Sequence, residues 1–238
     1  MEQKTPLTLH LPTMGTLIYL DSWLAIVAKE AGEPVQTRDS SLKTVVQELR
    51  ANLGDSRLQP VHRIDQPVSG AVIFARSGEI FSTIHGAIGR GELHRAYLAV
   101  VSTPPEPAQG VLRDHLMVPG DSGASGPRTR RTRVVHSDTE GSRQAVLRYE
   151  TLGRSDHHTV ILVELETGRH HQIRAQLAHR GWHVVGDALY GARRPMRDRS
   201  IALHAWYVSV PHPVLPDRIT CTADLPATAL WKGVGRLL

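Results

Sequence analysis

The stretch HRIDQPVSGAVIFAR, residues 62–76, joins a turn-forming segment to an apolar run and carries one acid, Asp65. GAVIFAR (70–76) has the length and continuous apolarity of a buried strand. Gln-Pro and Ser-Gly before it are typical of turns. A carboxylate beside Arg63 stays ionised, so Asp65 can act as a base or a nucleophile. Taken alone, an Asp before Gln-Pro is more often an ordinary turn starter than a catalytic group, and both interpretations stay open at this point.

Hydrophobic patterns on both sides of this stretch predict more strands than helices. Strands are expected at 17–21, 23–29, 94–101, 144–152, 158–166, 201–210 and 217–225. Helices are expected at 40–54, 79–92, 170–181 and 227–238, the first capped by Ser40 or Ser41 and ended by Gly54. Many neighbouring strands look like hairpins. The sequence therefore predicts an α+β fold, built on a mixed, mostly antiparallel sheet with flanking helices and loops.

The chain is basic, with 28 Lys and Arg against 23 Asp and Glu, a net charge of +5 and a pI of about 9.7. Most of these cations are arginines, whose planar fork suits phosphate oxygens and base stacking. A basic surface favours a polyanionic partner. The alternative is a GC-rich genome that encodes arginine in place of lysine. Composition leaves the two explanations at even weight.

The length and the single cysteine restrict the class of protein. Residues 1–15 are interpreted as an N-terminal tail and 16–238 as a single domain. Cys221 has no cysteine partner in the chain, so an intrachain disulfide is excluded and a reducing, cytoplasmic location is expected. No apolar run approaches eighteen residues, and the start lacks the pattern of a secretory signal, so we expect no membrane association.

Two further segments carry polar or aromatic groups suited to chemistry. Tyr97, early in a predicted strand, offers a stacking face and one hydroxyl, although a strand tyrosine is more often core. The segment TGRHHQIR (167–174) opens a predicted helix, whose amide end attracts anions. Arg169 could reach a phosphate there, and Gln172 could bond a base edge or the backbone. A merely solvated helix face is the alternative.

Four segments together resemble the RluA family of RNA pseudouridine synthases. HRIDQPVSGAVIFAR resembles the family's HRLD motif, RAYLAVV its K-x-Y-L strand, TGRHHQIRAQLAHRGWHVVGDALYG its TGR-x-HQ and GD-x-x-YG motifs, and LHAWYVSVPHP a later LHA…HP segment. Their order and approximate spacing agree over residues 16–226. Lys29-Glu30-Ala31-Gly32 departs from the frequent Lys-Pro-Ala-Gly and loses the stiffness of proline. Four ordered motifs are far more specific than any one of them.

The resemblance implies an isomerase that converts uridine in RNA to pseudouridine without a metal or cofactor. Asp65 then corresponds to the catalytic carboxylate, which attacks the nucleotide or abstracts a sugar proton. Arg174 corresponds to the arginine that pairs with it, and Tyr97 to the tyrosine that stacks on the uracil and helps to remove the C5 proton. The target base must leave its stack to reach Asp65, and Arg63 is expected to fill the vacated space or to grip the backbone.

RNA contacts are expected near these motifs and in two arginine-rich loops, 127–133 and 193–199. The residues expected to bind RNA are His62, Arg63, Arg95, Arg169, His171, Gln172, Arg128, Arg130, Arg131, Arg193 and Arg194. Fifteen residues ahead of the first predicted strand are too few for the small S4 domain that many relatives carry. We therefore expect a monomer that holds a stem-loop of ribosomal or transfer RNA through its catalytic domain.

Two other functions compete with this interpretation. Fourteen histidines suggest a metal-dependent hydrolase, but His170 and His171 would point about 100° apart on a helix, and no HExxH motif accompanies them. A non-catalytic RNA-binding protein on the same fold is the second alternative. The presence of Asp65, Tyr97 and Arg174 together favours the enzyme.

Overall fold

The computed structural model describes residues 9–11, 15–37, 39–118 and 131–237. The chain divides into two compact units. We call residues 1–95 with 204–232 the first unit, and residues 96–203 with 233–238 the second unit. Arg128 and Arg130, which the sequence nominates as RNA contacts, lie outside the described residues.

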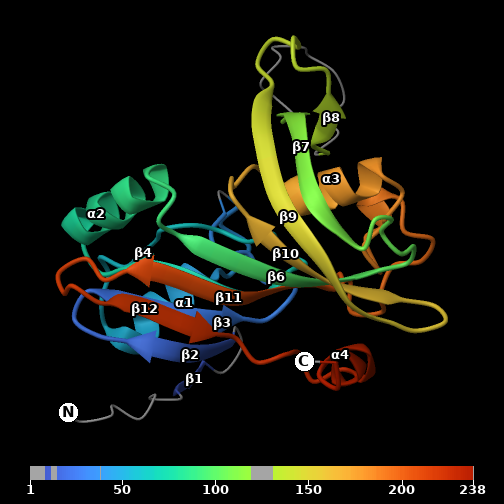
Figure 1. Ribbon diagram of the computed structural model, residues 1–238. Coiled ribbons are helices and arrows are strands. Elements are labelled where there is room, and N and C mark those ends of the chain that lie inside the picture. Colours follow the sequence, from blue (N-terminus) through green and yellow to red (C-terminus); the bar gives the residue numbers. More distant parts are fainter. Residues whose placement is uncertain (1–8, 12–14, 38, 119–130, 238) are drawn as a thin grey trace. The chain divides into compact units, whose positions relative to one another are not determined.

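The first unit is built on a mixed sheet (Figure 1). Neighbouring strands run in the order β1 (Leu9–Leu11), β2 (Gly15–Leu20), β3 (Leu24–Lys29), β5 (Ser69–Ala75) and β11 (Leu203–Pro211), with β4 (Gln59–Pro60) paired to β5 and β12 (Arg218–Thr222) paired to β11. The β5–β11 pair is parallel, whereas the β1–β2, β2–β3, β3–β5, β4–β5 and β11–β12 pairs are antiparallel. The predicted α+β class is confirmed.

Strand β5 forms the centre of this unit, because all seven of its residues are buried. One face packs with β3, β11, β12 and helix α2 (Gly78–Gly89) in a cluster that includes Ile26, Ile73, Ile84, Val210 and Ile219. Helix α1 (Val45–Leu53) is capped by Thr44, so the expected Ser40 or Ser41 cap is wrong, while Gly54 ends the helix at φ 61° as expected. Helix α4 (Ala229–Val234) closes the chain.

The Ser-Gly pair after the Asp65 turn is a close joint between β5 and β11. Gly70 has φ 117°, and a Cβ atom there would collide with the Ala205 carbonyl oxygen, so only glycine fits. The Ser69 hydroxyl lies 2.8 Å from His204 Nδ1, and His204 Nε2 lies 3.2 Å from the Ala223 carbonyl oxygen. Burial lowers the pKa of His204 to about 4, so the ring is neutral and can bridge both partners. This joint fixes the end of the Asp65 segment.

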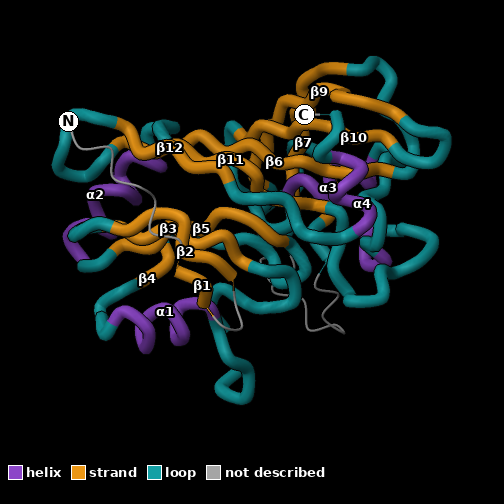
Figure 2. The backbone as a smooth tube through the Cα atoms, turned by 90° about the horizontal axis from the view of Figure 1, so that it is seen from below, coloured by secondary structure: helices purple, strands orange, loops and turns teal. Residues whose placement is uncertain are grey.

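The second unit is an antiparallel set in the order β6 (His94–Val101), β10 (Thr159–Leu165), β9 (Arg143–Arg154), β7 (Gln109–Met117) and β8 (Arg133–Val135). Helix α3 (Gln172–His179) and the short 3-10 helix η1 (Ala188–Tyr190) complete it. Figure 2 shows that strands and loops make up most of the chain and that its helices are short. Strand β7 is absent from the sequence-based prediction.

Helix α3 begins two residues later than expected, at Gln172. His171, which precedes it, has φ 50°, a left-handed conformation that is uncommon outside glycine. The His170 and His171 rings consequently stack, with centroids 3.8 Å apart and an interplanar angle of 18°. The expected divergence of these rings is therefore wrong, because the two residues lie ahead of the helix. Among the described residues, no helix is long and apolar enough to cross a membrane.

Candidate active site

Asp65 lies half-buried in a turn that the preceding loop holds in place. The Asp65 carbonyl oxygen accepts a hydrogen bond from Val68 N at 3.0 Å. Gly32 N donates to the Gln66 carbonyl oxygen at 2.8 Å, and Gln66 Nε2 donates back to the Gly32 carbonyl oxygen at 2.8 Å. These bonds fix the backbone on both sides of the Asp65 side chain, so the turn interpretation of the sequence is compatible with a chemical role.

A buried lysine supports the same turn. Lys29 is 2% exposed, and its Nζ donates to the carbonyl oxygens of Glu30 at 2.6 Å and Gln66 at 3.2 Å. Burial lowers the pKa of Lys29 to about 7, while the charges of Glu33, Asp65 and Glu30 oppose that shift. The Asp65 carboxylate therefore acts electrostatically on an amine at the base of its own turn.

His62 and Arg95 belong to the same unit as Asp65. His62 Nε2 accepts a hydrogen bond from Ile73 N at 3.2 Å, which places the ring proton of the neutral form on Nδ1. Burial and then the charge of Arg95 lower the pKa of His62 to about 3, so the ring stays neutral. His62 Nδ1 and Arg95 Nε have no hydrogen-bond partner within the described part of the chain. Arg63 is exposed.

Tyr97 and Arg174 belong to the second unit. Tyr97 is 6% exposed on β6, opposite Val163 of β10. Arg174 is 4% exposed on α3. The expected pairing of Arg174 with Asp65 joins residues of different units and stays a prediction.

Within its own unit, Arg174 pairs with an aspartate that sequence reasoning did not select. Its Nε lies 2.7 Å from Asp187 Oδ2 and its Nη2 lies 2.8 Å from Asp187 Oδ1, a bidentate pair. The side chains of Arg174 and Asp187 are 5% and 1% exposed. The Arg174 guanidinium carbon also lies 4.9 Å from the centroid of the Tyr190 ring. The guanidinium thus has a fixed plane and direction.

Asp187 and Tyr190 lie in a tight loop between α3 and the arginine-rich loop 193–199. Gly186 precedes them with φ 87°, and a Cβ atom there would lie 2.9 Å from the Ser200 carbonyl oxygen. Asp187 accepts a backbone hydrogen bond from Tyr190 N at 3.0 Å. Both residues lie in the GD-x-x-YG segment, which was the available sequence signal. The missing information was that this loop folds back onto α3.

Tyr190 contacts several of the residues that the sequence predicts to be functional. Its hydroxyl donates to the Thr132 carbonyl oxygen at 3.3 Å and lies 3.0 Å from His171 Nδ1. The Arg131 guanidinium carbon lies 5.0 Å from its ring centroid. Burial raises the pKa of Tyr190 to about 12, so its hydroxyl keeps its proton at neutral pH. The structure therefore brings Arg131, His171 and Arg174 together around one ring.

The Thr-Gly-Arg turn before α3 is organised by Gln172. Gln172 Oε1 accepts from Thr167 Oγ1 at 2.8 Å and from Arg169 N at 3.0 Å, and its Nε2 donates to the Val146 carbonyl oxygen at 3.1 Å. Gln172 is 3% exposed, so its amide shapes this turn. Arg169 is half-buried, and its Nε donates to the Gln144 carbonyl oxygen at 3.0 Å.

The remaining nominated cations lie at the surface. Arg131, Arg193 and Arg194 are exposed in the second unit, as Arg63 is in the first. A separate cavity of about 500 Å³ in the second unit is lined by residues of β7, β9 and β10, among them Arg148 and Glu164, and by none of the nominated site residues. Within the residues that the structure describes, no group of three or more His, Cys, Asp or Glu could hold a metal ion.

The chain is similar to known RNA pseudouridine synthases. The family model described as RNA pseudouridylate synthase matches residues 24–179, a span that includes Asp65, Tyr97 and Arg174. The chain is 29% identical over 234 residues to the uncharacterized RNA pseudouridine synthase YhcT of Bacillus subtilis, covering 94% of this chain and 74% of the relative. It is 28% identical over 233 residues to ribosomal large subunit pseudouridine synthase D of Pseudomonas aeruginosa, covering 90% and 69%.

Solved structures share the fold. Human RNA pseudouridylate synthase domain containing 4 matches with a TM-score of 0.72 and 18% identity, covering 93% of this chain and 92% of that one. Human RNA pseudouridylate synthase domain containing 1 matches with a TM-score of 0.71 and 18% identity, covering 100% and 97%.

Proposed function

The chain belongs to the RNA pseudouridylate synthase family of the RluA type, isomerases that act on RNA, and we propose that it converts specific uridines of structured RNA to pseudouridine with Asp65 as the catalytic carboxylate. The observation that supports this role best is the Asp65 turn, which the Gly32–Gln66 bonds and Lys29 hold while the carboxylate stays half-buried. A carboxylate on so well fixed a backbone is suited to meeting a reacting atom in a defined geometry.

The reaction exchanges one glycosidic bond for another. The bond between C1′ of the ribose and N1 of the uracil breaks, the base turns, and a bond between C1′ and C5 forms. The C5 proton then leaves, and N1 gains a proton. Asp65 either attacks the nucleotide or abstracts a sugar proton, and both routes need an ionised carboxylate. We propose that Arg174 keeps Asp65 ionised and that Tyr97 stacks on the uracil and assists the loss of the C5 proton.

Substrate binding is assigned to the exposed arginines. Arg63, Arg131, Arg193 and Arg194 project from the two units and can contact phosphates. We propose that Arg63, which precedes the Asp65 turn, occupies or braces the space that the flipped nucleotide leaves. Binding through phosphates predicts an affinity that falls steeply as salt rises, and a flat response would exclude these arginines as the phosphate grip.

Ribosomal RNA is the first substrate to test and transfer RNA the second. The similarity to ribosomal large subunit pseudouridine synthase D of Pseudomonas aeruginosa supports this order. We propose further that the protein acts as a cytoplasmic monomer. Sizing by light scattering with and without RNA tests the monomer, and cell fractionation tests the location.

The decisive experiment compares Asp65→Ala with the wild type on transcripts that carry tritium at C5 of uridine. Wild-type enzyme should release tritium from a large-subunit ribosomal or a transfer RNA transcript. Asp65→Ala should release none while its RNA affinity changes by less than about threefold, because phosphate contacts lie elsewhere. Asp156→Ala, at an exposed loop aspartate, is the matched control and should behave as the wild type.

Two outcomes would contradict the proposal. Full activity in Asp65→Ala would remove Asp65 from the chemistry. RNA binding by the wild type without tritium release from any transcript would favour the alternative, a non-catalytic RNA-binding protein on the same fold.

A further inference from the structure

Two guanidinium groups of the second unit, those of Arg131 and Arg174, share the ring of Tyr190. The Arg174 and Arg131 guanidinium carbons lie 4.9 Å and 5.0 Å from its centroid. The ring is 1% exposed and packs against Leu116 and Ala175 in a buried cluster. Arginine is attracted to the face of an aromatic ring, and this attraction grows when the pair is removed from water. The Tyr190 ring therefore contacts both a buried arginine, Arg174, and an exposed one, Arg131.

The hydroxyl of Tyr190 also holds Thr132, the middle residue of the basic segment 131–133. It donates to the Thr132 carbonyl oxygen at 3.3 Å, and His170 Nδ1 lies 3.0 Å from Thr132 Oγ1. Thr132 is 1% exposed, whereas Arg131 and Arg133 on either side are exposed. The threonine is thus an anchor, and the two arginines project from it toward solvent.

The same hydroxyl contacts the start of α3. His171 Nδ1 lies 3.0 Å from it, and the left-handed backbone of His171 turns the chain into the helix that carries Arg174. Asp187, three residues before Tyr190, holds Arg174 by two hydrogen bonds. The ring and hydroxyl of Tyr190 and the loop that carries it therefore connect the segment 131–133 with Arg174 through direct contacts of a few side chains.

We propose that Tyr190 is a positioning residue that couples RNA binding to catalysis by fixing Arg131–Arg133 and Arg174 in one geometry. Phosphates held by Arg131 and Arg133 stabilise the segment on Tyr190, and Tyr190 in turn keeps the Arg174 guanidinium in its plane. The coupling is reciprocal, so a change in the ring that displaces Arg174 also weakens RNA binding. This inference rests on the proposed function, because it takes Arg174 as part of the catalytic machinery.

Two substitutions separate the contacts of the hydroxyl from those of the ring. Tyr190→Phe removes the bonds to Thr132 and His171 and keeps the ring beneath both guanidinium groups. Tyr190→Leu removes the hydroxyl contacts and the aromatic ring together. Tyr149→Phe is the matched control, because Tyr149 is a buried tyrosine of the same unit whose hydroxyl donates to the Pro107 carbonyl oxygen at 3.1 Å. Each variant is measured for RNA affinity by filter binding and for the single-turnover rate at saturating tritiated transcript.

The expected results form a split between affinity and rate. Tyr190→Phe should weaken RNA affinity about threefold to tenfold, a modest loss for the two hydrogen bonds removed, and change the saturating rate by less than about twofold. Tyr190→Leu should also lower the saturating rate by roughly a hundredfold, since a misplaced catalytic group costs about that much. Tyr149→Phe should change neither quantity by more than about twofold.

Two results would overturn the inference: equal effects of Tyr190→Phe and Tyr149→Phe on affinity, or a wild-type saturating rate in Tyr190→Leu. If Tyr190→Leu does not fold, the Tyr190→Phe and Arg131→Gln pair decides, since coupling requires their effects on affinity to be non-additive and additive effects refute it. Failure of the proposed function is distinguishable, because the wild type would then release no tritium while the affinities of all variants remain measurable.

Discussion

Each of the two compact units buries an aspartate against arginine, but the surroundings of the two ion pairs differ. In the first unit, Asp55 is 6% exposed and bonds Arg57 and Arg76, whose side chains are 71% and 25% exposed. In the second unit, the side chains of Arg174 and Asp187 are 5% and 1% exposed. One aspartate therefore meets arginines that remain in contact with water, and the other meets an arginine that does not.

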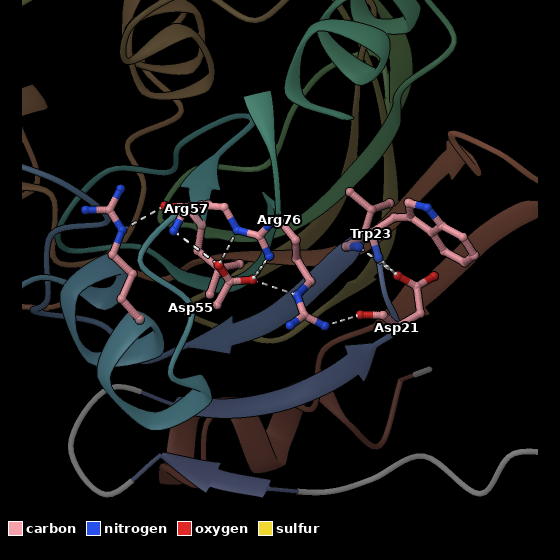
Figure 3. A network of polar contacts seen from close by, with 8 residues as sticks. Asp21, Trp23, Asp55, Arg57 and Arg76 are labelled. Carbon is pink, nitrogen blue, oxygen red and sulfur yellow. Dashed lines mark hydrogen bonds and ion pairs between the residues drawn. The ribbon is translucent and has the colours of Figure 1, made fainter. Parts of the chain in front are cut away.

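The partners of the first network belong to turns and strand ends (Figure 3). Arg76 continues from Asp55 to the Asp21 carbonyl oxygen at 2.6 Å, and the Asp21 carboxylate accepts from Trp23 N and Leu24 N at 2.7 Å each. Burial opposes ionisation of Asp21, but hydrogen bonds from Tyr19, Leu24, Trp23 and His212 outweigh it and lower its pKa. This network closes the β2–β3 turn and fastens the end of β5.

This difference in burial agrees with the proposed roles, in which the Asp55 network serves stability and the Arg174–Asp187 pair serves catalysis. Removing two charges from water costs several kcal/mol per ion, and apolar residues often replace a buried pair without loss of stability. The Arg174–Asp187 pair is thus a poor choice for stability alone. The two short bonds to Asp187 and the contact with Tyr190 fix the plane of the Arg174 guanidinium, which suits the catalytic role proposed for it.

The largest expected effect is that of Arg174→Ala. It leaves the Asp187 carboxylate buried without its bidentate partner, so the free energy of unfolding should fall by about 3–5 kcal/mol. The single-turnover rate should fall by at least roughly a hundredfold. Urea denaturation and tritium release measure the two quantities at a temperature where the variant is folded. A rate near that of the wild type would contradict the proposed catalytic role of Arg174. Both ion-pair networks would then have to be regarded as structural.

The sequence predicted most strands of both units, because their apolar residues form continuous runs or alternate. Strand β7 escaped detection because only Leu112 and Leu116 of its residues are buried. Residues four apart share a face of a strand but also of a helix, and the charged Asp114 stands between these two leucines, so the apolar alternation that marks a strand is missing. The start of α3 was misplaced for a different reason. His171 adopts a left-handed backbone that its residue type does not announce, and its side chain contacts Tyr190 instead of capping the helix.

The site was predictable only as far as its motifs reach. Asp65, Tyr97 and Arg174 stand in recognisable segments, and the family match spans all three. Asp187 and Tyr190 were quoted within a motif but given no role. Their importance depends on a loop that returns to the face of α3, a contact between residues 13 and 16 positions apart that periodicity does not encode.

Lys29 is the next residue to test, because it is an ionisable side chain of the first unit that is as deeply buried as the Arg174–Asp187 pair of the second unit. Its pKa of about 7 lies below the ordinary value of 10.5, so between these pH values the unfolded chain binds more protons than the folded one. The free energy of unfolding should therefore rise as pH increases from about 7 to about 10, by on the order of 3 kcal/mol.

Lys29→Met should lack this rise, while Lys43→Met, at an exposed lysine, should retain it. Urea denaturation at several pH values makes the comparison. If the free energy of unfolding depends on pH in the same way for the wild type and Lys29→Met, the Lys29 amine keeps its proton when buried. Lys29 would then behave like the solvent-exposed arginines of the Asp55 network.

A smaller loss is expected from Asp55→Asn, which tests the stability side of the comparison. The substitution weakens charged hydrogen bonds from Arg57 and Arg76, so the free energy of unfolding should fall by about 2 kcal/mol with the single-turnover rate unchanged within about twofold. Arg57→Ala should cost less than about 1 kcal/mol, since that arginine is 71% exposed. A large fall in rate with either variant would mean that this network also serves catalysis.

The smallest effect is expected at the residues that precede helices α1 and α3, which also differ between a structural and a proposed functional role. Thr44 caps α1 through a reciprocal bond with Gln47, whereas His171 precedes α3 without a side-chain cap. Thr44→Ala should lower the free energy of unfolding by about 1 kcal/mol and leave the rate unchanged, because the cap only satisfies backbone amides. His171→Ala should show the opposite balance, with little loss of stability and weaker RNA binding, because its side chain contacts the Tyr190 hydroxyl. Thermal unfolding and filter binding on both variants compare them directly, and equal stability losses would show that His171 acts as a helix cap after all.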